Sequence, residues 1–233
     1  FKQALEIYKK KLGEQHRTYV DCLSNFSSVH IAMGDYRTAE SCLKKVLEID
    51  KKTVGEEHPD YATTLNKLGV VYYYIGDYNA VVPYFKQALE IYKKTVGEEH
   101  IDYLYCIENL GAIYNRLFDF KASLSCSKQI LESKKKIFGE EHLEYAIALN
   151  NIGVTYWHMG DFKAAELCYK QALQIKMKTT DIHNSSFAGG LANLAVLYSD
   201  MGDYKAAESF GKQALEIYKK TLGEEHPNYA HIN

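Results

Sequence analysis

The sequence predicts an all-α solenoid built from antiparallel helix pairs, and three observations carry that prediction. A Gly-Asp pair recurs at a step of 42 residues. A Gly-Glu-Glu-His tetrapeptide recurs at the same step. Between these two signals, the apolar residues follow the i, i+3, i+4, i+7 spacing of one helix face. A fixed period of this length indicates a repeat array rather than one globular domain.

The repeat is visible at two kinds of loop. The Gly-Asp pair begins at Gly34, Gly76, Gly160 and Gly202. Phe118-Asp119 stands where the remaining pair is expected. The tetrapeptide begins at Gly55, Gly97, Gly139 and Gly223, with a Gly-Glu-Gln-His variant at Gly13. Each repeat therefore contains two loops, and we expect one helix between each loop and the next.

One repeat, taken at residues 59–100, shows how the two helices are delimited. Apolar residues mark one helical face in 59–79 and a second face in 80–100. Gly76 suits the C-terminal cap of the first helix, and Asp77 can cap the N-terminus of the second. Gly97 is placed to end the second helix after a pair of lysines, whose charges favour a helix C-terminus.

Neither helix of a pair can bury its apolar face alone, so consecutive pairs are expected to stack without a central core. Small residues recur where helices must approach closely, at Gly69, Gly111, Gly153 and Ala195 in first helices and at Ala39, Val81, Ser123, Ala165 and Ala207 in second helices. We expect a single array over residues 1–233, with about five full pairs and partial repeats at both ends. Because neither end carries a polar capping repeat, we expect a fragment of a longer protein whose end faces favour end-to-end self-association.

Composition narrows the class of protein further. The 233 residues include 28 Lys+Arg and 30 Asp+Glu, so the chain is nearly neutral and not a strongly basic nucleic-acid binder. No apolar run approaches the roughly 18 to 20 residues of a membrane span. The N-terminal segment lacks the apolar core of a signal peptide. Five cysteines without a secretory context indicate a reducing compartment, and we expect a cytoplasmic protein.

The order of residues within a repeat resembles the tetratricopeptide repeat. The matching positions are Leu68, Gly69, Tyr72, Gly76, Tyr78, Phe85 and Ala88. The longer, 42-residue unit resembles the repeats of kinesin light chains and nephrocystin-3-like proteins. This resemblance implies a right-handed superhelix (an α-α superhelix) whose concave surface is lined by the first helix of each pair. Related light-chain arrays bind short peptides with acidic residues, so the resemblance also implies a protein that binds other polypeptides.

Asparagines occupy a fixed register on the first helices. The position before the Leu-Gly pair, or its equivalent, reads Asn25, Lys67, Asn109, Asn151 and Asn193. The position one residue earlier adds Asn66 and Asn150. Asparagine is a poor residue for a helix interior. Two interpretations stay open: the amides hold the backbone of an extended peptide, or they bond to a neighbouring helix of the array.

Further candidate peptide-binding residues lie beside these amides. Tyr73, Asn115, Arg116 and Trp157 are expected on the same face, and aromatic and arginine side chains are enriched at interface hot spots. Lys67 and Arg116 could receive a carboxylate of the ligand. The acidic residues Glu108 and Asp200 on this face leave open whether the ligand is acidic.

Several residues that could suggest chemistry are explained by the repeat. The loop histidines lie one repeat apart, so one site cannot gather them, and zinc-protease and phosphate-loop spacings are missing. The sequence therefore predicts no catalytic residue, metal site or cofactor, and the chain is not expected to be an enzyme. His58 and His226 each precede a proline and are expected to start a helix.

The cysteines and lysines follow the register too. Cysteines at equivalent positions of stacked repeats are too far apart for the ~4.4 to 6.8 Å Cα separation of a disulfide. Each lysine cluster is followed by glutamates in the loop, which argues against a nucleic-acid or membrane partner. We therefore expect a protein or peptide ligand in the concave groove. The alternative is a sensor or autoinhibitory arm that contacts a folded partner or another domain of the full-length chain.

Overall fold

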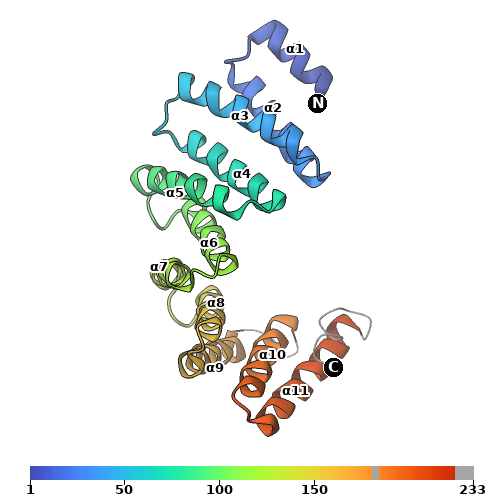
Figure 1. The fold of residues 1–233 in the computed structure, drawn as a ribbon, viewed down its shortest axis with the longest axis vertical. Coiled ribbons are helices and arrows are strands. Elements are labelled where there is room, and N and C mark those ends of the chain that lie inside the picture. The colour runs from blue at the N-terminus through green and yellow to red at the C-terminus, as the bar shows by residue number, and fades with distance from the viewer. Residues whose placement is uncertain (180–183, 224–233) are drawn as a thin grey trace. The chain divides into compact units, whose positions relative to one another are not determined.

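The computed structural model describes residues 1–179 and 184–223, and every regular element within these ranges is an α-helix (Figure 1). The helices are α1 (Lys2–Leu12), α2 (Arg17–Ala32), α3 (Tyr36–Thr53), α4 (Pro59–Ile75), α5 (Tyr78–Thr95), α6 (Ile101–Arg116), α7 (Phe120–Phe138), α8 (Leu143–His158), α9 (Phe162–Thr179), α10 (Ser185–Asp200) and α11 (Tyr204–Leu222). Even-numbered helices are the first members of the predicted pairs. The predicted all-α fold of helix pairs is confirmed.

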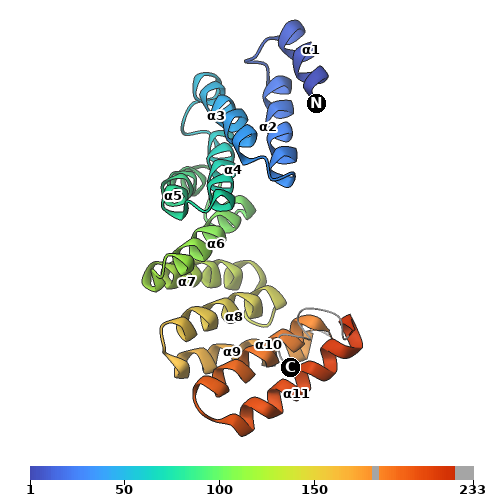
Figure 2. The ribbon, with the colours of Figure 1, turned by 45° about the vertical axis from the view of Figure 1, so that its right-hand side comes forward.

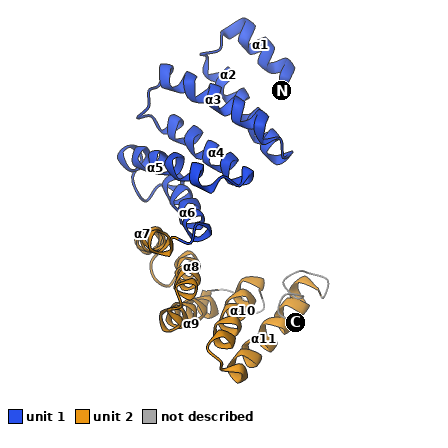
Figure 3. Cartoon of the chain, viewed as in Figure 1, with its two compact units in different colours: residues 1–118 blue, residues 119–233 orange. Residues whose placement is uncertain are grey.

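The chain divides into two compact units, residues 1–118 and residues 119–233 (Figure 3). In unit 1, helices that follow one another in the chain pack together from α1 to α6. In unit 2, α7 to α11 pack in the same successive way, and Figure 2 shows α8 to α11 side by side in chain order. Each unit therefore buries its apolar surface between neighbouring helices, as stacked pairs must.

Aspartates start the second helices. The Oδ1 atoms of these aspartates accept a hydrogen bond from the backbone N–H three residues later, at 3.1 Å in Asp35, Asp77, Asp119, Asp161 and Asp203. The preceding residue has left-handed backbone, with φ 87° at Gly76 and φ 59° at Phe118. Phe118 is the one non-glycine residue with positive φ in the described residues. The turn thus keeps its geometry even where glycine is missing.

Histidines start the first helices. Nδ1 of the loop histidine accepts a hydrogen bond from the backbone N–H two residues later, at 3.1 to 3.3 Å in His16, His58, His100 and His142. Asn184 holds the corresponding place before α10, where its Oδ1 accepts from the N–H of Phe187 at 2.8 Å. The prediction that His58 starts a helix with proline at its first position is confirmed. His226 lies outside the described residues.

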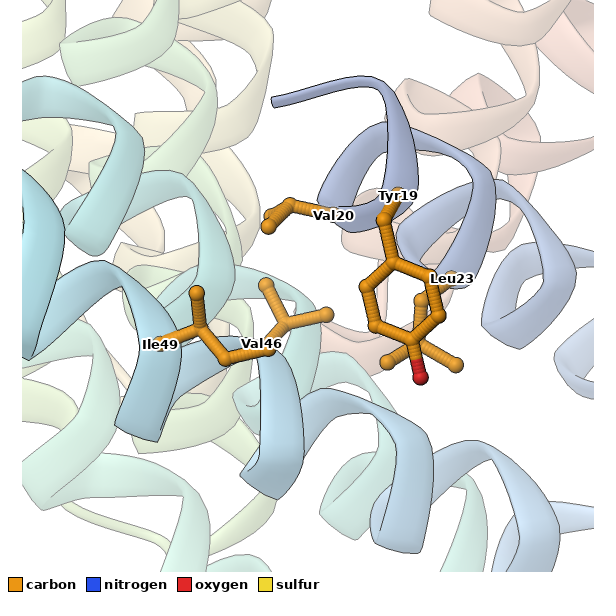
Figure 4. Packing of buried hydrophobic residues seen from close by; sticks show 5 residues of the cluster. All are labelled: Tyr19, Val20, Leu23, Val46 and Ile49. Carbon is orange, nitrogen blue, oxygen red and sulfur yellow. The ribbon is translucent and has the colours of Figure 1, made fainter. Parts of the chain in front are cut away.

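Apolar side chains fill the space within each pair. Between α2 and α3, the side chains of Tyr19, Val20 and Leu23 point toward those of Val46 and Ile49 (Figure 4). All five are buried, with exposures of 7% or less. Burial of such side chains contributes most of the stability of helices that are too short to persist alone.

Glycines let the two helices of a pair approach closely. A Cβ atom added to Gly69 would lie 2.8 Å from the ring of Phe85, and one added to Gly153 would lie 2.6 Å from the ring of Tyr169. Real Cβ contacts are longer than this, so only glycine fits against these two rings. The small residues predicted at Gly69 and Gly153 therefore have a direct packing reason.

The cysteines, the possible metal ligands and the hydropathy of the helices in the described residues bear on the sequence predictions. All five cysteines are free thiols, and burial raises the pKa of Cys168. No cluster of three or more His, Cys, Asp or Glu side chains that could hold a metal ion occurs among residues 1–179 and 184–223. A search of the same residues finds no helix with the length and hydropathy of a membrane span.

Candidate binding face

All of the predicted site residues lie on first helices. They are Asn25 on α2, Asn66, Lys67 and Tyr73 on α4, Asn109, Asn115 and Arg116 on α6, Asn150, Asn151 and Trp157 on α8, and Asn193 on α10. Three of these, Asn25, Arg116 and Asn151, are exposed. Asn66 is buried, and the others are half-buried. We call the surface that these residues form on the first helices of each unit the binding face.

Some of these residues bond to one another across successive first helices. In unit 2, Nδ2 of Asn193 donates to Oδ1 of Asn150 at 2.9 Å. In unit 1, Nζ of Lys67 donates to Oγ of Ser24 at 2.6 Å. In both cases the two residues are 43 positions apart, one more than the repeat length. Each bond therefore joins the position before the Leu-Gly pair of one repeat, or its equivalent, to the position one residue earlier in the preceding repeat. These contacts follow the second interpretation of the register, in which the side chains join neighbouring helices.

Asn66 and Asn109 are also 43 positions apart, like Asn150 and Asn193, but their side chains form no hydrogen bond with each other. Asn66 is only 9% exposed, and its Oδ1 has no hydrogen-bond partner. The buried Nδ2 of Asn109 also has none. One atom is an acceptor and the other a donor, as in the bonded Asn150–Asn193 pair. Because both atoms are enclosed, a ligand can reach them only if these side chains turn.

Arg116 and Tyr73 contact each other rather than standing apart. The Arg116 guanidinium lies 5.3 Å from the ring centroid of Tyr73 and 5.7 Å from that of Tyr78, within the range of cation–π attraction. The Tyr73 ring meets Tyr74 edge-on at 5.4 Å. The beginning of α5 thus supplies Tyr78, which sequence reasoning did not include. The exposed guanidinium can still offer N–H groups to a carboxylate.

A polar pocket of about 360 Å³ opens between α2 and α4 in unit 1, with α3 as its floor. Its lining comprises Arg17, Val20, Asp21, Ser24 and Asn25 from α2, Val46 and Asp50 from α3, and Asp60, Thr63, Thr64 and Lys67 from α4. Asp50 is only 3% exposed, and Oγ1 of Thr64 donates to its Oδ2 at 2.9 Å. Burial raises the pKa of Asp50 and lowers the pKa of Lys67. We call this the Asp50 pocket.

The register explains why the Asp50 pocket exists. The equivalent positions in the other second helices hold Tyr8, Tyr92, Lys134, Lys176 and Tyr218. Tyr92 is 1% exposed and its hydroxyl lies 3.0 Å from Oγ1 of Thr63, so its ring fills the corresponding space in the next repeat. Aspartate is much shorter and leaves that space open. Sequence reasoning missed Asp50, although comparing each register position across the repeats would have found it.

A second, mainly apolar pocket of about 740 Å³ lies in unit 2. It is lined by Val154 and Trp157 of α8, Tyr169 of α9, Ala192, Asn193, Ala195, Val196 and Ser199 of α10, and Ala207, Glu208, Gly211, Lys212 and Leu215 of α11. Gly211 holds the register position of Phe85 and Tyr169, so a ring is missing here. Nε1 of Trp157 donates to Oδ2 of Asp200 at 2.6 Å, which fixes the indole at the rim. We call this the Trp157 pocket.

The comparisons with known proteins agree with this geometry. Models described as tetratricopeptide repeat match residues 1–52, 23–94, 103–178 and 188–228. The chain belongs to the tetratricopeptide repeat family. Proteins with such repeats are generally non-enzymatic scaffolds for protein–protein interaction, and the fold described above is of that kind. No curated protein matches the chain.

Solved structures show the same fold at low sequence identity. BtubC (BKLC) from P. vanneervenii is 22% identical with a TM-score of 0.76, over 97% of this chain and 93% of that one. A putative kinesin light chain with nearly identical TPR-like repeats from Podosopora anserina is 22% identical with a TM-score of 0.79, over 89% and 98%. The apo form of RapI is 20% identical with a TM-score of 0.80, over 99% of this chain and 62% of RapI. The resemblance to kinesin-light-chain-like repeats is thereby confirmed at the level of fold.

Proposed function

We propose that this array is a protein–protein interaction scaffold that binds an extended polypeptide segment along its binding face. One observation carries the proposal: the lining of each pocket includes residues of two consecutive first helices, and each lining includes residues of the predicted amide register. Asn25 and Lys67 line the Asp50 pocket, and Trp157 and Asn193 line the Trp157 pocket. An extended segment along either unit would therefore find amides for its backbone and pockets for its side chains.

The exposed amides are the groups best placed to hold a backbone. The side chains of Asn25 and Asn151 are exposed and form no hydrogen bond within the described residues. Each amide can accept one hydrogen bond from a peptide N–H and donate to a carbonyl. Such contacts hold a chain without reading its sequence, so specificity falls to the pockets.

The Trp157 pocket is suited to an apolar side chain of the segment. Its lining includes the indole of Trp157 together with the apolar side chains of Val154, Val196 and Leu215. Large apolar residues that enter such pockets supply most of the affinity at many interfaces. The salt bridge between Glu208 and Lys212 at 2.5 Å adds polar groups at the edge. We expect an apolar residue of the bound segment here, flanked by residues that tolerate water.

The test is selection of random 12-residue peptides on the whole chain, followed by fluorescence polarisation with the selected peptides. Asn25→Ala and Asn151→Ala, singly and together, are expected to weaken binding, with about tenfold loss for one well-made pair of backbone contacts. The melting temperature should stay within about 1 °C of wild type, because neither side chain bonds to the array.

Asn79→Ala is the matched control, since Asn79 is an exposed asparagine on the second helix α5. It should leave binding unchanged. Selected peptides that bind both double variant and wild type equally would refute the proposed binding face. If selection yields no peptide and a folded domain binds instead, the scaffold acts as the sensor arm described above.

A further inference from the structure

The Asp50 carboxylate lines its pocket without a direct ion pair, although Arg17 and His58 attract it from farther away. Asp50 accepts one hydrogen bond from Thr64 and is 3% exposed. Within residues 1–179 and 184–223, no lysine, arginine or histidine nitrogen lies within the 4.0 Å of an ion pair with it. A buried carboxylate that lacks a cation is costly, and the cost falls when a cation arrives with good geometry.

The cations that line the pocket are engaged elsewhere. Arg17 pairs with Asp60 and, through Nε at 2.9 Å, with Asp21. Lys67 donates to Ser24 on the neighbouring helix. The lining holds three carboxylates, those of Asp21, Asp50 and Asp60, against two cations. The local charge therefore favours a positively charged guest over a negative one.

Other repeats show which kind of side chain this space accommodates. At the register position of Asp50, Nζ of Lys134 donates to Oε2 of Glu144 at 2.7 Å. Nζ of Lys176 donates to the carbonyl oxygen of Ser186 at 2.9 Å. Both lysines are buried, with exposures of 8% and 5%. The space between a second helix and the next first helix can thus hold an aliphatic stem that ends in an ammonium group with an oxygen partner.

We propose that the Asp50 pocket binds the side chain of a lysine or arginine from the segment held on the binding face, with its cation on the Asp50 carboxylate. This inference rests on the proposed function. The guest enters between α2 and α4, where Val20 and Val46 contact its aliphatic stem. Asn25 and Lys67 at the same opening donate to backbone carbonyls of the segment. The pocket volume lies at the lower end of the roughly 300–1,000 Å³ of small-ligand sites, which suits a single side chain.

A small-molecule probe tests the pocket without any peptide. n-Butylguanidinium is titrated into the chain and followed by backbone amide chemical shifts, with pentanamide and pentanoate as neutral and anionic probes of similar size. The guanidinium is expected to shift the amides of Thr63 and Thr64, and the other two probes are not. Asp50→Asn should weaken guanidinium binding about tenfold or more, because it removes the charged partner. Asp50→Tyr should abolish it by filling the space.

Asp102→Asn is the matched control. Asp102 is the register equivalent of Asp60 one repeat later, is exposed, and lies where Tyr92 fills the corresponding space. This variant removes the same charge and should leave guanidinium binding unchanged. An equal loss of guanidinium binding in Asp102→Asn would overturn the inference, because it would show general electrostatic attraction. Guanidinium binding that survives in a folded Asp50→Asn chain would overturn it too, because Asp50 would then not be the charged partner. Stronger binding of pentanoate also overturns it.

The peptide selection separates this inference from the proposed function. Enrichment of lysine or arginine at one position of the peptides, lost when selection is repeated on Asp50→Asn, supports both. Peptides that bind the face without a basic preference sustain the proposed function and refute the role of Asp50. A guanidinium site at Asp50 on a chain that selects no peptide sustains the cation pocket and refutes the peptide scaffold.

Discussion

The Asp50 pocket of unit 1 and the Trp157 pocket of unit 2 arise in the same way and differ in chemistry. In each, one second-helix position lacks the large side chain that most other repeats carry there. Asp50 replaces tyrosine or lysine and leaves a charged floor, whereas Gly211 replaces an aromatic ring and leaves an apolar hollow. A repeat array can therefore vary its binding chemistry at single positions while its loops and caps hold the scaffold constant.

The first prediction concerns Tyr169, where the aromatic ring that Gly211 lacks is present at the equivalent position. Gly153→Ala would place a Cβ atom 2.6 Å from the Tyr169 ring. The ring is buried and packed, so we expect a loss of about 1–3 kcal/mol in unfolding free energy. Each kcal/mol lowers the melting temperature by about 2–4 °C in a chain of this size. Thermal unfolding followed by circular dichroism measures the change.

Gly190→Ala supplies the comparison for Gly153. Its Cβ would meet only the flexible end of Leu173, at 3.1 Å, and alanine gains about 1 kcal/mol of helix propensity over glycine. We expect a melting temperature close to wild type. A Gly153→Ala chain as stable as Gly190→Ala would show that the Tyr169 ring does not hold the two helices apart.

The second prediction concerns a substitution that makes the Asp50 position the same as in other repeats. Asp50→Tyr restores the residue found at Tyr8, Tyr92 and Tyr218. It should fill the cavity and remove a buried charge, and cavity-filling substitutions commonly add about 0.5–2 kcal/mol. Urea unfolding monitored by circular dichroism should show a higher midpoint. A lower midpoint would mean that the space between α2 and α4 is too narrow for the ring.

The third prediction compares two asparagines of neighbouring first helices. Asn193→Ala removes the hydrogen bond to Asn150 and is expected to cost about 0.5–1.5 kcal/mol. Asn151→Ala removes an exposed side chain without a bond and should lie within about 0.5 kcal/mol of wild type. The measurement is the midpoint of urea unfolding of the two variants. Equal midpoints would mean that the Asn193–Asn150 bond does not stabilise the array and that Asn193 is available to a ligand.

The fourth and smallest effect is the pH dependence of the Asp50 pocket. Burial raises the pKa of Asp50 above its ordinary value of 3.8, so the folded chain binds a proton more tightly than the unfolded chain. Ionised Asp50 therefore lowers stability at neutral pH, and this penalty is relieved as the pH falls through the raised pKa toward 3.8. The free energy of unfolding of wild type, relative to that of Asp50→Asn, should therefore increase as the pH falls from 7 to 4. A difference that does not change with pH would contradict the assignment.

The fold was largely predictable because its determinants are periodic. The 42-residue step located the loops between the described helices up to α9, and the caps at Asp77 and His58 follow from the residue type at a fixed place. The left-handed backbone of Phe118 follows from the same register, although phenylalanine itself disfavours that conformation.

The site was predictable in part. The register placed the asparagines on the first helices but not their partners, because helix periodicity fixes a face and not a side-chain rotamer. For that reason the Asn150–Asn193 bond and the enclosed Asn66 are visible only in the structure. Asp50 was not predicted because recurrence reveals residues that are the same in each repeat, whereas Asp50 differs from the tyrosine or lysine at the equivalent positions.

The capping residues make the start of each first helix a separate unit. Nδ1 of the loop histidine accepts from the backbone N–H at the starts of α2, α4, α6 and α8, and the amide oxygen of Asn184 does so at the start of α10. Removal of one cap leaves one helix start without its side-chain acceptor, at a cost of about 0.5–2 kcal/mol, while the other first helices keep theirs. An array of this kind can therefore accept a change at one loop without loosening the remaining loops.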